Sequence, residues 1–276
     1  MVDKGMTLLA TGQEATPRGP VTTGRGWRSL SPALVAPLAL LVLWQAATAT
    51  GLLPEQILPS PSRVVQTFAE LAASGELSSA ARISFWRLAV GLALGGSLGL
   101  VFGLALGASQ RVEQWVGPTF RAFAAVPALG WIPVLILLVG IDEMLKVIIL
   151  TKACFVPVAI ASRDAWRAVP PGYEELGQVL GLSPSARFLR IRLPAMVPLI
   201  FGGLRLASGQ AFVSLVTCEM LAATEGIGYL MIWGRTLFQM DVVIVGMIVV
   251  GTAGIALDRT LRLLEHLIRK RMGEDV

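Results

Sequence analysis

Few residues of this chain could do chemistry, and they form no catalytic constellation. The one histidine, His266, lies among basic residues near the C-terminal end, and Cys154 and Cys218 fall inside apolar runs without metal-ligand spacing or a disulfide framework. None of the four lysines is followed by serine or threonine, so the sequence contains no G-x-x-x-x-G-K-[ST] phosphate-binding motif. We therefore predict no catalytic residue, no metal site and no cofactor bound by this chain.

Three charged residues inside apolar runs are the remaining candidates, namely Lys152, Arg205 and Glu219. A charge at the centre of a membrane helix costs roughly 2.5–3.5 kcal/mol on insertion scales, so such residues usually face a protein interior or a cavity. Lys152 and Arg205 could give an anionic solute a transient positive field in a translocation pathway. The alternatives are structural pairing, for instance of either cation with Glu219, and snorkelling to an interface.

The most polar long stretch between two apolar runs is Pro170–Pro194, which we term the polar insert. Pro170 and Pro171 keep the preceding helix from continuing, and residues 173–180 can form a short helix. Gly181 permits a left-handed turn, and Ser183 with Pro184 can begin a second short helix. The pattern predicts a bent helix–turn–helix that projects into water; an ordinary loop is the alternative.

The composition indicates that lipid surrounds the elements that position these residues. Of 276 residues, 54% are hydrophobic and only 15% are charged, whereas soluble domains have about 25% charged residues. The net charge of +5 does not indicate nucleic-acid binding, because the basic residues are dispersed and are not interleaved with aromatic side chains.

Six apolar runs have about the length needed to cross a bilayer, which predicts an all-α membrane protein. Ala47-Thr48-Ala49 resembles a signal-peptidase site, but the run before it starts late and is long, so we expect an uncleaved first span. Three prolines in the third run predict kinks. An amphipathic helix is expected after Ser62, the candidate N-cap, and a loop at 223–240. The expected spans are 31–50, 88–109, 115–139, 144–161, 195–222 and 242–257.

Five glycines in the second span recur at every fourth residue. Residues four apart share a helix face, so the sequence predicts a flat seam along which another helix packs closely. The alternative is that glycine is simply common in membrane helices. The glycines are Gly91, Gly95, Gly99, Gly103 and Gly107.

The distribution of lysine and arginine predicts the topology. With both termini inside, 16 of the 23 basic residues lie on the inner side, which places the polar insert in the cytoplasm. We expect a disordered cytoplasmic tail at 1–30, a six-helix permease domain at 31–260 and a basic cytoplasmic tail at 261–276.

The polar insert resembles the cytoplasmic loop of permease subunits of ABC importers, whose motif is Glu-Ala-Ala, a glycine four positions later, nine residues and Ile-x-Leu-Pro. Here Glu175-Leu176-Gly177 stands in place of Glu-Ala-Ala, Gly181 follows in register, and Ile191–Pro194 closes the motif. Leu176 and Gly177 depart from the two alanines. Further segments, among them Leu58–Pro61 and Gly226–Leu230, are similar to permeases for nitrate, aliphatic sulfonates and taurine.

The resemblance implies a type I importer permease in the bacterial inner membrane. It implies a homodimer of this chain, an ABC ATP-binding subunit dimer that holds ATP and Mg²⁺, and an extracytoplasmic solute-binding protein. The coupling loop, residues 163–194, would contact the ATPase. A motor-independent secondary transporter or channel is the alternative function, and a non-transporting scaffold is a third. The coupling residues are Tyr173, Glu174, Glu175, Gly177, Gly181, Ile191, Leu193 and Pro194.

Overall fold

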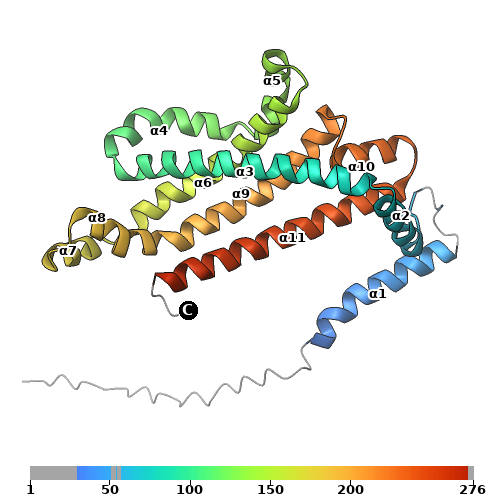
Figure 1. Cartoon of the computed structure of the whole chain (residues 1–276), viewed down its shortest axis with the longest axis horizontal. Coiled ribbons are helices and arrows are strands. Elements are labelled where there is room, and N and C mark those ends of the chain that lie inside the picture. Colours follow the sequence, from blue (N-terminus) through green and yellow to red (C-terminus); the bar gives the residue numbers. More distant parts are fainter. Residues whose placement is uncertain (1–29, 51–53, 55–56, 273–276) are drawn as a thin grey trace, which may run out of the picture. The chain divides into compact units, whose positions relative to one another are not determined.

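The computed structural model describes residues 30–50, 54 and 57–272, and every regular element in those ranges is a helix (Figure 1). The tail expected at 1–30 lies outside the described residues except for Leu30, which begins α1. Helix α1 (Leu30–Ala49) has 20 residues and contains Pro37. The all-helical expectation is confirmed for the part of the chain that the structure describes.

Four long apolar helices form the body of residues 45–276. They are α3 (Glu76–Ala108), α6 (Glu143–Ala168), α9 (Leu193–Ala222) and α11 (Met240–Arg271). Each is long enough to cross a membrane, and a bent helix pair raises the number of candidate spans in the described ranges to five. The described apolar part of α1, Val35–Ala49, is shorter than these helices.

The third expected span, 115–139, is broken at one of its three prolines, as expected, but the break is sharper than a kink. The chain forms α4 (Gln110–Ala125), a 3-10 turn η2 (Ala128–Trp131) and α5 (Ile132–Val139), with a bend of 88° between the two parts. Pro127 lies at the break, where its ring and missing N–H prevent α4 from continuing. Pro118 and Pro133 are tolerated within or at the start of helices.

Several other boundaries differ from the expectation. The loop expected at 223–240 contains α10 (Ile227–Thr236). Helix α2 (Pro61–Ala73) is capped by Ser60, whose hydroxyl accepts the N–H of Arg63 at 3.3 Å, so the expected cap at Ser62 is wrong. Pro61 then occupies the first helical turn, where proline is favoured.

The glycines of α3 lie against α6. A Cβ atom on Gly95 would lie 2.6 Å from Cys154 Cβ, and one on Gly107 would lie 2.6 Å from Trp166 Cβ. The other three, Gly91, Gly99 and Gly103, face Leu150, Phe155 with Val158, and Ala159 with Ser162 in the same way. Any larger residue would therefore separate the two helices.

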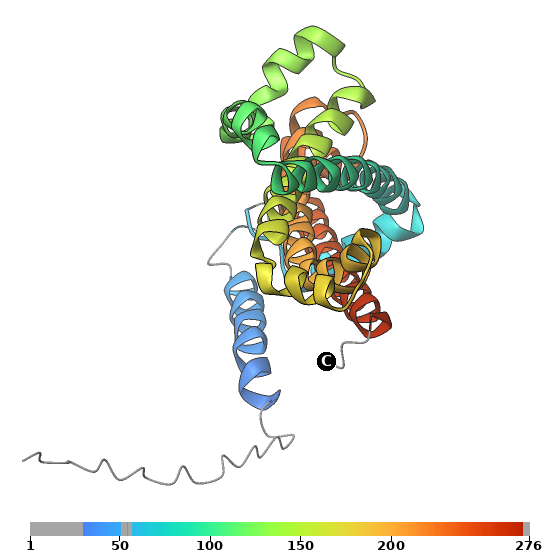
Figure 2. The same cartoon turned by 90° about the vertical axis from the view of Figure 1, so that its left-hand side faces the viewer.

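The shorter helices mark the two ends of the long ones. Helix α7 (Pro171–Val179) and α8 (Pro184–Arg187) lie at one end with the C-terminal end of α11, and α2 and α10 lie at the other (Figure 1). Figure 2 views the molecule from the α7–α8 side. The polar insert is thus held between the ends of α6 and α9.

Candidate functional site

The polar insert folds as the bent pair of helices that its sequence predicts. Helix α7 ends at Val179 and is followed by Gly181, which has φ +68°, a conformation that glycine adopts without steric cost. The N–H of Gly181 donates to Gln178 O at 2.9 Å, and the N–H of Leu182 donates to Gly177 O at 3.0 Å, which is a Schellman motif. Ser183 caps α8 by accepting the N–H of Ala186 at 3.3 Å. A π-helical turn at 188–192 then leads directly into α9.

Side-chain contacts fix the polar insert to α6. Arg192 donates to a carboxylate oxygen of Glu174 at 2.8 Å, and its guanidinium lies 4.2 Å from the ring centre of Trp166. Gly177 is buried, and a Cβ atom there would lie 2.9 Å from Arg187 Cγ and 3.0 Å from Ile191 Cδ1. These contacts join α7, the π-helical turn and α6 into one unit, so a force on α7 reaches both long helices.

Helix α7 presents an apolar patch outward from this polar stretch. Val179 is 84% exposed and Leu180 is 64% exposed, and Tyr173 and Leu176 are also exposed. Glu175 is exposed beside them. Exposed apolar side chains on a helix that projects from the ends of the long helices are typical of a protein–protein contact. Leu193 and Pro194 begin α9 and connect the patch to the membrane segment.

Lys152 belongs to α6, and its ammonium group contacts the break between α4 and η2. Its Nζ donates to the backbone carbonyl of Val126 at 2.6 Å and lies 4.5 Å from the ring centre of Phe123 and 5.8 Å from that of Trp131. Because α4 ends here, the carbonyl of Val126 has no N–H partner in a following helical turn, and the ammonium of Lys152 from α6 donates to this carbonyl instead. Neither Glu219 nor another carboxylate among the described residues forms a salt bridge with Lys152.

A cavity of about 640 Å³ adjoins this break. It is lined by residues of α4, η2, α6 and α9, including Arg205 and Gln210. The guanidinium of Arg205 also forms a salt bridge with Glu265 of α11. Lys152 is not itself a lining residue, but its Nζ bonds the carbonyl of Val126, and both neighbours of Val126, Ala125 and Pro127, line the cavity.

Glu219 belongs to a buried charge cluster at the α10 end of the long helices. It is 1% exposed and accepts hydrogen bonds from Arg87 at 2.7 Å, from Ser84 at 2.8 Å and from the N–H of Gly228 at 2.9 Å. Arg87, 2% exposed, also donates two hydrogen bonds to Glu143 at 2.6 and 2.8 Å. In this conformation Glu219 is fully engaged inside the protein and does not line the cavity near Lys152.

Sequence reasoning missed Arg87 and Lys146 as members of this cluster, because the cluster is built around partners of Arg87 that lie far away in the sequence. Lys146 is 5% exposed and donates to Glu143 at 2.6 Å. A signal was present in Gly226-Ile227-Gly228, since Gly226 has φ +115° and a Cβ atom on Gly228 would lie 2.6 Å from Glu219 Cβ. Two glycines there allow the start of α10 to approach the carboxylate.

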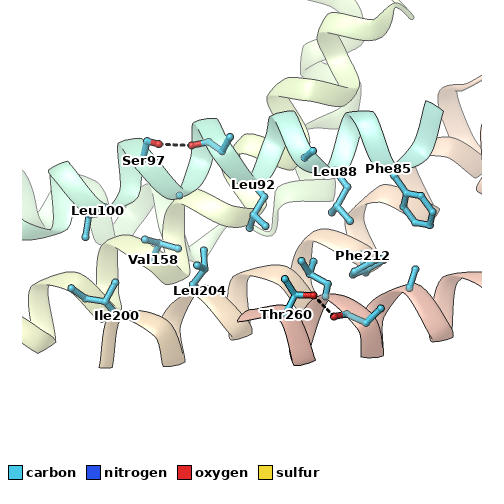
Figure 3. A pocket seen from close by; sticks show the side chains of 16 residues that line it. Phe85, Leu88, Leu92, Ser97, Leu100, Val158, Ile200, Leu204, Phe212 and Thr260 are labelled. Atoms are coloured by element: carbon cyan, nitrogen blue, oxygen red, sulfur yellow. Dashed lines mark hydrogen bonds between the residues drawn. The ribbon is translucent and has the colours of Figure 1, made fainter. Parts of the chain in front are cut away.

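A larger apolar groove runs between α3, α9 and α11 (Figure 3). Its volume is about 800 Å³, and Phe85, Leu92, Leu204 and Phe212 are among its walls. The hydroxyls of Ser97 and Thr260 donate to carbonyls of their own helices, Ala93 O and Ala256 O. The groove has no charged lining residue, so it offers an anion no partner.

Comparison with known proteins establishes the family. Residues 95–270, more than half of the chain, match the family model described as binding-protein-dependent transport system inner membrane component. The chain belongs to this family of ABC importer permeases. The permease is also 33% identical over 264 residues to a putative aliphatic sulfonates transport permease of Bacillus subtilis, which covers 96% of this chain and 95% of the relative.

Two further relatives are also described as permease proteins. The permease is 37% identical over 231 residues to the corresponding Escherichia coli protein, a putative aliphatic sulfonates transport permease, over 84% of this chain and 88% of that one. It is 29% identical over 244 residues to a nitrate import permease of Synechocystis, over 85% and 87% of the two chains. The permease is therefore the non-catalytic, multi-pass inner-membrane component of a transporter that uses an ATPase and a binding protein as partners.

Proposed function

We propose that the permease imports a small anion of the aliphatic sulfonate, taurine or nitrate class, using ATP hydrolysed by a partner chain. The exposed apolar patch on α7 is the single observation that carries the energy-coupling part of this proposal. Since α7 is joined through Trp166, Glu174 and Arg192 to α6 and α9, movement of a docked ATPase would move both helices. The names of the relatives support the solute class.

The proposed assembly has two copies of the permease, two ATP-binding subunits and one extracytoplasmic binding protein. Each copy would contribute six spans of a type I importer within residues 31–260, with both termini and the coupling loop, 163–194, in the cytoplasm. The excess of basic residues on that side supports this orientation. ATP and Mg²⁺ would bind only to the ATPase subunits, because this sequence has no phosphate-binding motif.

The proposed pathway passes Lys152 and Arg205. Lys152 has no carboxylate partner among the described residues, and Arg205 lines the cavity beside it. We assign Glu219 a structural part in this conformation because its oxygens already accept three donors, from Ser84, Arg87 and Gly228.

Uptake by reconstituted vesicles tests the function. The permease is purified with its ATPase, reconstituted with ATP inside, and supplied with the binding protein and labelled ethanesulfonate, taurine or nitrate outside. We expect uptake of at least one of these anions that requires both ATP and the binding protein. Uptake at the same rate without ATP would support a motor-independent transporter and contradict the proposal.

A further inference from the structure

We propose that the cavity beside the α4–η2 break is a subsite for an organic anion with an apolar tail, in which Lys152 and Arg205 hold the anionic group. The inference rests on the proposed function and deepens it, because it places part of the solute selectivity in the permease itself. Alkanesulfonates have this chemistry, whereas nitrate has no tail.

Lys152 is held by neutral partners that an anion can replace. Lys152 contacts a neutral carbonyl, Val126 O, and the ring of Phe123, and forms no salt bridge with any described carboxylate. A sulfonate carries a full negative charge and attracts the ammonium more strongly than a neutral carbonyl does, so it competes favourably for Lys152. Arg87 and Lys146 are instead almost fully buried, 2% and 5% exposed, and are paired with carboxylates.

Arg205 and Gln210 supply further donors on α9. Only one terminal nitrogen of Arg205 contacts Glu265 in the described structure, and a guanidinium has five N–H donors. Gln210 lines the same cavity with an amide that can donate. A tetrahedral sulfonate has three oxygens and can use several of these donors together.

The remaining walls of the cavity suit a hydrocarbon tail. Leu129, Val156, Leu206 and Val213 line it from η2, α6 and α9. The volume of about 640 Å³ lies within the range of about 300–1,000 Å³ typical of small-molecule sites. An alkyl chain leaves water for these apolar walls, which stabilises a longer alkanesulfonate more than a shorter one.

The first experiment tests whether Lys152 binds the anionic group of the solute. Vesicles with ATP inside contain the permease–ATPase complex and take up labelled butanesulfonate presented on the same binding protein in every arm. We expect Lys152→Met to lower the uptake rate at least roughly tenfold, while Lys152→Arg keeps most of it. Bound ATPase per permease is measured in each variant and should not change. Wild-type uptake by Lys152→Met would overturn the inference.

The second experiment tests whether the cavity accommodates the alkyl tail of the solute. Gly209 lines the cavity, and a Cβ atom there meets nothing within 4 Å, so Gly209→Leu adds an apolar side chain to the cavity from an open position. Gly251 on α11 is equally open and lies outside the cavity, which makes Gly251→Leu the matched control. We expect the ratio of octanesulfonate to methanesulfonate uptake to fall several-fold in Gly209→Leu alone.

The outcomes separate this inference from the proposed function. An unchanged chain-length ratio in Gly209→Leu, or an equal fall in Gly251→Leu, would overturn the subsite. ATP-driven uptake of nitrate with no uptake of any sulfonate would also overturn it, while the importer function would stand. A wild-type complex that takes up none of these anions with ATP would contradict both.

Discussion

Arg87 and Glu219 form a salt bridge of 2.7 Å although they lie 132 residues apart in the sequence and both are almost fully buried. Arg87 joins α3 to Glu143 of α6, to Glu219 of α9 and to the carbonyl of Glu225 before α10. One guanidinium therefore connects α3, α6, α9 and the segment before α10 at this end of the long helices.

Replacing this guanidinium should destabilise the permease strongly. Arg87→Met leaves Glu219 buried without its charge partner, and breaking such a pair costs about 3–5 kcal/mol. We expect a large fall in the thermal unfolding temperature of the detergent-purified protein. Arg82→Met, at an exposed position of the same helix, is the control and should unfold as the wild type does. Similar unfolding temperatures for the two variants would contradict a structural part for Arg87.

The glycine seam can be tested with two adjacent residues. A Cβ atom on Gly95 would lie 2.6 Å from Cys154 Cβ, whereas one on Gly96 would lie 3.7 Å from the nearest atom, Leu204 Cδ1. Gly95→Ala should thus cost about 1–3 kcal/mol through overpacking. Gly96→Ala should be neutral or slightly stabilising, because alanine favours helix more than glycine does. Equal thermal stability of the two variants would show that α3 and α6 are not in close contact.

The turn at Gly181 should be required for coupling. Valine at φ +68° is strained, so Gly181→Val should abolish solute-stimulated ATP hydrolysis by the complex while the permease still inserts into the membrane. Asparagine tolerates this conformation better, and Gly181→Asn should retain much of the activity. Unchanged stimulation in Gly181→Val would show that the shape of the turn does not matter.

The sequence predicted local features of the fold better than the pairing of its helices. The glycine spacing correctly identified one face of α3, but the partner helix α6 became visible only in the structure. The helices of the polar insert were confirmed because proline, glycine and serine act within a few residues of their position. The break at Pro127 was expected as a kink, yet the bend of 88° depends on which group holds the carbonyl of Val126.

Long-range pairing explains the remaining differences. Nothing near Arg87 in the sequence indicates Glu143 or Glu219 as its partners. Lys152 was identified because a cation in an apolar run is conspicuous, but its contacts with Val126 and Phe123 come from a different helix. The end of α11 at Arg271 extends past the span expected to end at residue 257, since its C-terminal residues also favour helix.

Binding of the ATPase by the polar insert is the central claim, and co-purification tests it most directly. Val179→Asp places a charge at the most exposed residue of the α7 patch, which is 84% exposed. Val65→Asp makes the same change at a 69% exposed valine of α2, at the opposite end of the long helices. We predict that Val179→Asp loses the co-purified ATPase and its solute-stimulated hydrolysis and that Val65→Asp keeps both. Full retention of the ATPase by Val179→Asp would contradict the account.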